Sequence, residues 1–263
     1  MTDQGGDELR HAGTYRVRFD EAGPDGLLRT SSLLRYAQDI GWRHSEARGF
    51  DRGWYGAHDL AWVVRAAEIE VVDRIATGAR LAITTAVLGY QRIWARRRAE
   101  CRTADGRLAA WVQTDWVMID GRGRLTRVPA AIPERFPGRL LTEPLVRVAL
   151  AEPPAAASVS RFTVRAHELD PMNHVNNAVY VDWLLDALDG AGGEAAAVVH
   201  RRPLHLRLEY AAAAGPGDAI EARTWAHDGG WACRLRTSAG ADLFRATISA
   251  AGTQPAAPDG ARS

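Results

Sequence analysis

The chain contains no lysine, so all 33 of its basic residues are arginine. This absence excludes Schiff-base catalysis and the lysine of a phosphate-binding P-loop. Cysteine is also scarce, because Cys101 and Cys233 stand alone without a CxxC motif. Two such residues build neither a disulfide framework nor a zinc knuckle, which favours a reducing compartment.

Long apolar runs and an excess of charge are missing as well. No run approaches the roughly 18 apolar residues of a membrane helix, and the N-terminal MTDQGGDELRHAG has no apolar signal-peptide core. The formal net charge is +1, whereas nucleic-acid and membrane-surface proteins carry a basic excess. We therefore expect a cytoplasmic protein that binds neither nucleic acid nor membrane.

What is present fits a globular protein with two similar halves. Apolar residues make up 46% and charged residues 25% of the 263 residues, which is ordinary for a soluble fold. A stretch with six prolines, residues 129–157, separates the halves. We predict an N-terminal domain over residues 10–128, a Pro-rich linker over 129–157, a C-terminal domain over 158–251 and a disordered tail over 252–263.

The two halves read as a repeat. Residues 67–87 and 206–225 each have the pattern of a strand, a turn and a strand, and Glu70 and Gly78 are spaced like Glu209 and Gly217. Residues 94–120 and 231–251 each add two further strands around a glycine turn.

Before these strands, each half has one predicted strand and one long helix. YRVRF precedes a helix over 31–49 with Ser31 or Ser32 as N-cap, and SRFTVRA precedes a helix over 176–190 with Asn176 or Asn177 as N-cap. The second helix is apolar around most of its circumference, so a sheet must wrap around it. The predicted fold is α+β: a tandem (double) hotdog of two antiparallel sheets, each wrapped around a long central helix.

These motifs resemble those of the acyl-acyl-carrier-protein thioesterases, which are double-hotdog enzymes. The matching text is DLAWVVRAAEIEVVDR and RRRAECRTADGRLAAWVQTDWVMIDGRGRLTRVP in the first half, with ELDPMNHVNNAVYVDWLLDAL and LRLEY in the second. The family pattern is Asp-x-Asn-x-His-Val-Asn-Asn, with a Glu and often a Cys after the LEY strand. Here Met172 takes the first Asn position, Asn173 follows it, and four alanines from Ala211 replace the region of the Glu and Cys.

The resemblance implies hydrolysis of an acyl thioester without a metal or organic cofactor. The start of the second long helix supplies N–H groups for a developing oxyanion, and Asp170 could activate water or attack the carbonyl. His174 could share its proton, and the amide of Asn173 or Asn176 could position water or the thioester. Because the first half lacks an HVNN motif, we expect one active site per chain.

Each of these residues also has a purely structural interpretation. The two asparagines are good helix caps, Asp170 with Pro171 is a common turn opening, and a single His174 is often structural. His167, Asp170 and His174 could in principle bind a metal, but three loop residues without a distant ligand make that the weaker reading.

Further residues are candidates for binding substrate and carrier. The first half should shape the acyl tunnel, and the candidate wall residues are Leu33, Trp42, Trp54, Trp62, Val64, Asn177 and Tyr180. The arginines proposed to receive an acidic acyl carrier protein and its phosphopantetheine-linked acyl chain are Arg97, Arg98, Arg201 and Arg202. The segment PERFPG resembles the His-Phe-Pro-Gly segment of hotdog dehydratases, but Arg135 replaces the His, so we interpret it as part of the linker.

The sequence thus predicts a thioesterase that releases a fatty or polyketide-type acid from acyl carrier protein. An acyl-CoA thioesterase and a non-catalytic acyl-binding hotdog protein are the alternatives, the second motivated by the missing Glu and Cys. A monomer and a homodimer are both compatible with a tandem hotdog.

Overall fold

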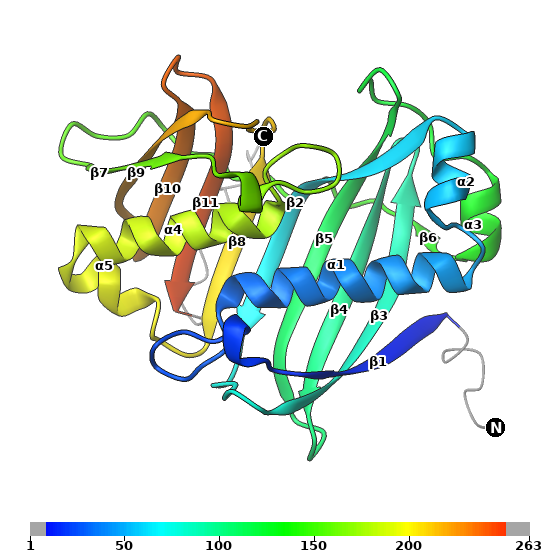
Figure 1. The fold of residues 1–263 in the computed structure, drawn as a ribbon, viewed down its shortest axis with the longest axis horizontal. Helices are drawn as coiled ribbons and strands as arrows, with labels where there is room; N and C mark the ends of the chain where they lie inside the picture. Colours follow the sequence, from blue (N-terminus) through cyan, green and yellow to red (C-terminus); the bar gives the residue numbers. More distant parts are fainter. Residues whose placement is uncertain (1–8, 251–263) are drawn as a thin grey trace, which may run out of the picture.

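Two long helices lie across one face of a single curved sheet (Figure 1). The computed structural model of the protein describes residues 9–250, so the tail predicted for residues 252–263 lies outside the described residues. The first half comprises β1 (Arg10–Arg16), the 3-10 turn η1 (Phe19–Glu21), α1 (Thr30–Ala47), α2 (Arg52–Ala57), β2 (Leu60–Val71), β3 (Arg80–Gln91), β4 (Trp94–Thr103) and β5 (Leu108–Asp120).

The second half repeats this plan. It comprises β7 (Ser158–Thr163), the 3-10 turn η2 (Ala166–Glu168), α4 (Asn177–Ala191), α5 (Gly193–Val198), β8 (Leu204–Tyr210), β9 (Ala219–His227), β10 (Gly230–Thr237) and β11 (Asp242–Ala250). Between the halves lie α3 (Ala131–Arg135) and β6 (Arg139–Leu140). Both predicted sets of strands and both long helices are present.

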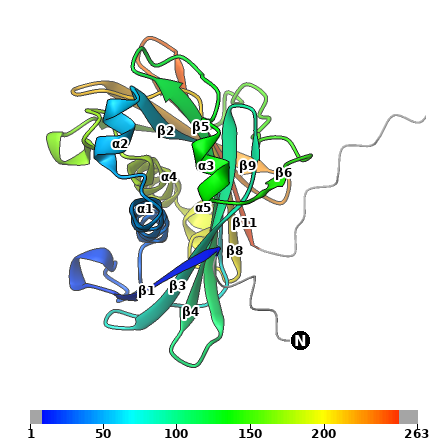
Figure 2. The same cartoon turned by 90° about the vertical axis from the view of Figure 1, so that its right-hand side faces the viewer.

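The strands form one sheet and not the two predicted sheets. Its order is β1-β3-β4-β5-β2-β8-β11-β10-β9-β7, with β6 added in parallel to β3. The halves join because β2 and β8 pair antiparallel, with Ala67 opposite Leu208 and Ile69 opposite Leu206. Viewed from the side, the sheet curls around α1 and α4 (Figure 2). The fold is therefore a double hotdog with a continuous sheet.

Burial explains why the sheet wraps the helices. Inward residues of β2, such as Ala67 and Ile69, are fully buried, whereas the alternate Glu68 and Glu70 are half-buried on the outer face. One apolar core contains residues of α1, α4 and both halves of the sheet. The helices also touch directly, since Arg35 of α1 and Asp182 of α4 form an ion pair of 2.8 Å.

The predicted N-cap of the first helix is wrong by two or three residues. α1 begins at Thr30 after Arg29, whose side chain makes no capping hydrogen bond, and Ser31 and Ser32 are buried in the first turn. The chain enters the helix from a tight turn that fixes its start, so a serine cap is not needed there. In α4 the predicted cap Asn176 is correct.

The proline-rich stretch is not a free connection. Ile132 and Phe136 are buried in an aromatic cluster at one end of the first half, and Leu141 is fully buried against the outer face of the sheet. The chain then crosses that outer face, because the N–H of Val146 donates to Asp115 on β5 and the N–H of Val148 donates to Glu209 on β8, each at 2.9 Å. We call residues 141–152 the strap.

Candidate active site

The turn before α4 is held by its own backbone. The N–H of Asp170 donates to the carbonyl of His174 at 2.8 Å, and the N–H of Asn173 donates to the carbonyl of Asp170 at 2.9 Å. Oδ1 of Asp170 accepts the N–H groups of Met172 at 2.8 Å and of His174 at 3.3 Å. These bonds fix the carboxylate at the end of the turn and leave Oδ2 without a hydrogen bond within residues 9–250.

The first half contains the same turn before α1. The N–H of Gly23 donates to the carbonyl of Leu27 at 2.8 Å, and the N–H of Gly26 donates to the carbonyl of Gly23 at 3.0 Å. Gly26 has a φ of +72°, and Asn173 at the equivalent position has a φ of +61°. Asparagine is one of the residues that tolerate this left-handed conformation, so the backbone explains why Asn173 is there.

Comparing the two turns shows which residues the turn conformation requires. Both contain a proline, a residue with positive φ and a buried aliphatic residue at equivalent places. The side chains that differ in kind are paired as follows: Gly23 and Asp170, Asp25 and Met172, Leu27 and His174, Arg29 and Asn176. Since the first turn forms the same backbone without an imidazole or an amide, these two groups are not required for folding. A carboxylate is present in both turns, because Oδ1 of Asp25 accepts the N–H of Leu27 at 3.0 Å as Oδ1 of Asp170 accepts the N–H of His174 at 3.3 Å.

The start of α4 adds hydrogen-bond donors beside these side chains. Oδ1 of Asn176 accepts the N–H of Ala178 at 2.9 Å, and the carbonyl of Asn176 accepts the N–H of Val179 at 2.9 Å. The N–H of Asn177 finds no acceptor in the part of the chain that the structure describes. A free N–H at the positive end of a 15-residue helix suits a developing oxyanion.

A cavity of about 1000 Å³ extends from this turn into the first half. Asp170, His174 and Asn176 contribute to its wall at one end. Trp62 and Val64 of β2 contribute further along, followed by residues of β3, β4 and α3. Asp170, His174 and Asn176 therefore line one and the same largely apolar space.

Most predicted wall residues lie on this cavity. Trp42, Trp62, Val64, Asn177 and Tyr180 line it, and the hydroxyl of Tyr180 accepts the N–H of Ala214 at 2.9 Å. Leu33 is a correction: it is only 1% exposed and belongs to the shared core, because it faces the sheet from the first turns of α1. Trp54 is a second correction, since it packs on Phe50 and Tyr55 in the aromatic cluster.

Of the four predicted catalytic residues, Asn173 is not brought to the cavity. It is exposed and occupies the positive-φ position of the turn, while Met172 beside it does line the cavity. The imidazole of His174 is exposed and makes no hydrogen bond to another described residue. Ala211, Ala212 and Ala213 line the cavity after β8, so methyl groups stand where the family pattern leads us to expect a carboxylate and a thiol.

The four arginines predicted to receive a carrier do not share a surface. Arg97 and Arg98 are neighbours on β4 and point to opposite faces of the sheet, as strand geometry requires. Arg97 lines the cavity, whereas Arg98 lies over the ring of Trp111 at 4.1 Å on the outer face. Arg201 and Arg202 precede β8, at the end opposite Tyr210, about 20 Å from the candidate site at 3.3 Å per residue.

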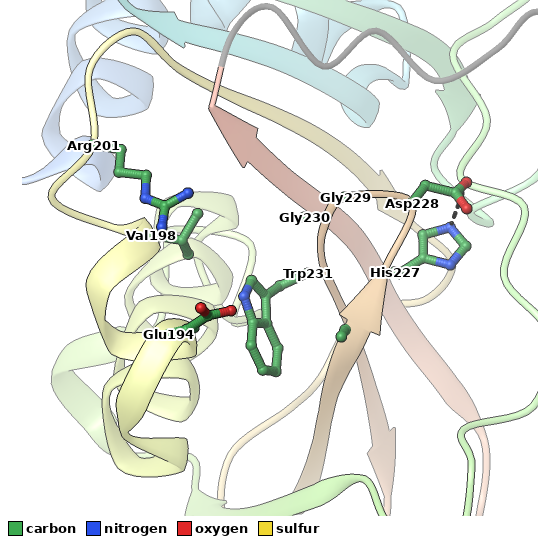
Figure 3. Close-up of a pocket in the computed structure, with 9 residues that line it drawn as sticks. Glu194, Val198, Arg201, His227, Asp228, Gly229, Gly230 and Trp231 are labelled. Atoms are coloured by element: carbon green, nitrogen blue, oxygen red, sulfur yellow. Dashed lines mark ion pairs between the residues drawn. The ribbon is translucent and has the colours of Figure 1, made fainter.

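Arg201 belongs to a separate hollow at the far end of the second half. Figure 3 shows Arg201, Glu194 and Trp231 gathered between α5 and the β9–β10 hairpin, with His227 and Asp228 turned to the other side of that hairpin. The hollow measures about 360 Å³ and does not communicate with Asp170 through any shared wall residue. The four arginines therefore do not form one patch, and their role in receiving a carrier stays a prediction.

The described residues contain no group of three or more His, Cys, Asp and Glu side chains arranged to hold a metal ion. Among the same residues, no helix is both long enough and apolar enough to span a bilayer. Cys101 and Cys233 are free and buried, and burial raises the pKa of the Cys101 thiol to about 12.

Comparison with known proteins agrees with this geometry. The family described as "Acyl-ACP thioesterase N-terminal domain" matches residues 8–136, and "Acyl-ACP thioesterase C-terminal domain" matches residues 151–249. The chain belongs to the acyl-ACP thioesterase family. The N-terminal match includes α3 and Phe136, which supports counting them with the first half.

Similar proteins from this family include plant enzymes. Oleoyl-acyl carrier protein thioesterase 1, chloroplastic, from Arabidopsis thaliana is 24% identical over 69% of this chain and 56% of its own length. A palmitoyl-acyl carrier protein thioesterase from Gossypium hirsutum is 26% identical over 69% of this chain and 48% of its own length. The chain thus spans about half the length of these curated relatives.

Solved structures share the fold. The 12:0-ACP thioesterase from Umbellularia californica has a TM-score of 0.77 and 20% identity, covering 92% of this chain and 96% of its own. An acyl-ACP thioesterase from Bacteroides thetaiotaomicron has a TM-score of 0.76 and 15% identity, covering 94% and 99%. At these identities the likeness establishes the double hotdog, as expected from the sequence.

Proposed function

We propose that this protein hydrolyses the thioester of an acyl chain carried on acyl carrier protein and releases the free acid. The observation that carries the proposal is the contrast between the two equivalent turns. Only the turn before α4 places a carboxylate, an imidazole and an amide on the wall of the cavity, whose volume of about 1000 Å³ can hold an acyl chain. Membership of the family supports the same activity.

In this proposal the acyl chain lies in the cavity with its thioester at the start of α4. The free N–H of Asn177 donates to the carbonyl oxygen and stabilises the negative charge that develops on it. The apolar wall formed by Trp62 and Val64 excludes water from the chain but not from the exposed mouth at His174.

Two routes start from the unbonded Oδ2 of Asp170. In one, Oδ2 takes a proton from a water molecule whose oxygen attacks the carbonyl carbon. In the other, Oδ2 attacks that carbon itself and the resulting anhydride is cleaved by water. In both, the carbon–sulfur bond breaks and the departing thiolate takes up a proton, which the imidazole of His174 is placed to supply.

The test compares hydrolysis of a panel of acyl-carrier thioesters by the wild type and by Asp170→Asn. The asparagine keeps an oxygen for the two backbone N–H groups but removes the base or nucleophile, so we expect a fall in kcat of at least about 100-fold. The matched control is Asp25→Asn, because Oδ1 of Asp25 accepts the N–H of Leu27 at 3.0 Å in the equivalent turn. Asp25→Asn should retain full activity.

The same panel separates the rival functions. Higher kcat/KM on acyl-CoA than on every acyl carrier protein would make CoA the carrier. Tight binding of acyl chains without turnover on any carrier would overturn hydrolysis and favour the acyl-binding alternative, for which the alanines at residues 211–213 are the supporting observation. The buried, free thiols also suit the cytoplasmic location that we propose.

A further inference from the structure

Arg97 is a half-buried cation on the wall of the cavity. Its side chain points inward from β4, opposite Val87 of β3 and Thr114 of β5. One terminal nitrogen, Nη1, donates to Nδ1 of His44 at 2.9 Å and to the hydroxyl of Thr85 at 3.4 Å. The remaining guanidinium N–H groups, on Nε and Nη2, find no acceptor among residues 9–250 and border the cavity.

No carboxylate balances this charge within the described part of the chain. The groups that favour the charged form of Arg97 are the phenols of Tyr90 and Tyr55, and burial lowers the pKa of the guanidinium to about 10. Arg97 is therefore still protonated at neutral pH. The neighbouring Arg96 differs in this respect, because it points outward and forms an ion pair with Asp115 at 2.6 Å. A cation that no carboxylate neutralises, with free N–H groups on a cavity wall, is suited to receive an oxygen acceptor from a ligand.

Two further groups near Arg97 have a polar hydrogen without an acceptor in the described residues. His44 is neutral, since burial and the nearby Arg97 lower its pKa to about 3. Because Nδ1 of His44 accepts from Arg97, its hydrogen must be on Nε2, which is buried and has no acceptor among the described residues. The hydroxyl of Tyr90, another wall residue, likewise has no partner in residues 9–250.

Arg97 lies deep in the cavity relative to Asp170. Tyr210 of β8 marks the catalytic end, because its hydroxyl donates to the carbonyl of Asn177 at 3.0 Å. From β8 the sheet runs through β2 and β5 to β4, which at about 4.8 Å per strand places Arg97 about 14 Å away. A chain whose thioester is at the start of α4 would reach Arg97 with its distal part.

The helix opposite makes room for this side chain. A Cβ on Gly41 of α1 would lie 3.2 Å from Cδ of Arg97. Glycine inside a helix costs about 1 kcal/mol relative to alanine, so the position of Arg97 is accommodated at the expense of helix stability. The ring of Phe136 lies 5.8 Å from the guanidinium and covers it from the side of α3.

We propose that Arg97 binds an oxygen acceptor carried by the distal part of the acyl chain, so that the substrates are oxygenated acyl chains and not plain saturated ones. This inference rests on the proposed hydrolysis and names its substrate class. The acceptor is either a terminal carboxylate, which would supply the missing counter-charge, or a keto or hydroxyl oxygen. Charge-assisted hydrogen bonds from a guanidinium to such oxygens are about twice as strong as those between neutral groups.

The experiment measures kcat/KM on three chain-length-matched series of acyl carrier protein thioesters: saturated, terminally carboxylated, and keto or hydroxyl-substituted near the distal end. We expect the wild type to favour an oxygenated series by at least about 100-fold over the saturated one. Arg97→Met, which keeps length but removes every donor, should abolish that preference, and Arg97→Lys should retain part of it if the acceptor is a carboxylate.

Binding of the free acids supplies a readout that does not need turnover. Long-chain monocarboxylic, dicarboxylic and oxo acids are titrated calorimetrically into the wild type and into Arg97→Met, and their affinities are compared. Asp170→Asn serves as a control because it keeps Arg97. Arg97-dependent binding without turnover would refute hydrolysis and keep the distal acceptor site. Equal or better use of saturated chains by the wild type, with no change in Arg97→Met, would overturn the inference while leaving hydrolysis established.

Discussion

Asn176 and Arg29 occupy equivalent positions in the two halves, and only Asn176 caps its helix with its side chain. Oδ1 of Asn176 accepts the N–H of Ala178, whereas Arg29 is exposed and makes no cap. Asn176 therefore has a structural role in addition to its place on the cavity wall.

The first prediction separates these two roles. Asn176→Ala should lower the free energy of unfolding by about 1 kcal/mol, the usual value of an N-cap. Arg29→Ala should change it by less than about 0.5 kcal/mol, as at most exposed positions. Urea denaturation measures both. If hydrolysis falls more than about tenfold in Asn176→Ala under conditions where the variant stays folded, the amide also acts on the substrate.

The second prediction concerns the attachment of the strap. Glu209 is 1% exposed and accepts the N–H of Val148, with Arg147 at 2.9 Å and Arg65 at 3.3 Å. Glu209→Gln removes the charge from this group, and we expect a loss of about 3 kcal/mol because two arginines lose their partner.

Glu70 provides the matched control because it is the repeat equivalent of Glu209. It accepts the indole N–H of Trp111 at 2.7 Å and is half-buried. Glu70→Gln keeps an oxygen that accepts this N–H, so it should cost less than about 1 kcal/mol. Equal losses for the two variants would contradict a special role of Glu209 in holding the strap.

The third prediction is a pH dependence of stability that arises at His44. In the folded protein its pKa is lowered from 6.5 to about 3 by burial, Arg97 and His11, whereas the unfolded chain protonates normally. Between these values only the unfolded state binds the extra proton, so stability falls as the pH decreases from about 6.5 toward 3.

His44→Gln should flatten this part of the profile. Glutamine can still accept from Arg97 but does not titrate, so the difference in unfolding free energy between the variant and the wild type should grow in favour of the variant below about pH 6. Thermal unfolding across that range tests it. If the pH dependence of stability is the same in His44→Gln and the wild type, the pKa of His44 is not lowered in the folded protein.

The fourth prediction uses the contact between Gly41 and Arg97. Gly41→Ala favours the helix by about 1 kcal/mol but pushes on the Arg97 side chain. We expect little change in melting temperature and a fall of about tenfold in the preference for oxygenated chains. The control is Gly190→Ala in α4, where the nearest atom to a new Cβ is 3.6 Å away, so stability should rise without any change in selectivity.

Much of the fold could be predicted because the apolar periodicity occurs twice. The repeat of Glu70 and Gly78 in Glu209 and Gly217 is real, and both glycines adopt positive φ, +81° and +76°. The pairing of β2 with β8 was not predicted, since a pattern within one strand does not identify its neighbour across the sheet. The short α2, α3 and α5 also went unpredicted, because six residues or fewer carry too little periodicity.

The motif at the start of α4 was predicted from the sequence, but the part of the cavity around Arg97 was not. Asp170, His174 and Asn176 stand close together in sequence, so their convergence at one helix start follows from the chain itself. Arg97 was predicted to receive the carrier protein because it lies in a run of three arginines. The alternation of β4 would have placed it inward, on the same face as Ala99 and Cys101, both of which are buried.

The continuous pairing of β2 with β8 also affects how the two turns can diverge. In a dimer of identical subunits, one substitution alters both copies of a turn, because a single coding sequence specifies them. Here the turns around Gly23 and Asp170 are encoded separately, so each can mutate alone. The copy before α1, residues 23–29, contributes no residue to the cavity, whereas the copy before α4 lines it with Asp170, His174 and Asn176. The fold is nearly twofold symmetric, but only one of its two equivalent turns places candidate catalytic side chains on the cavity.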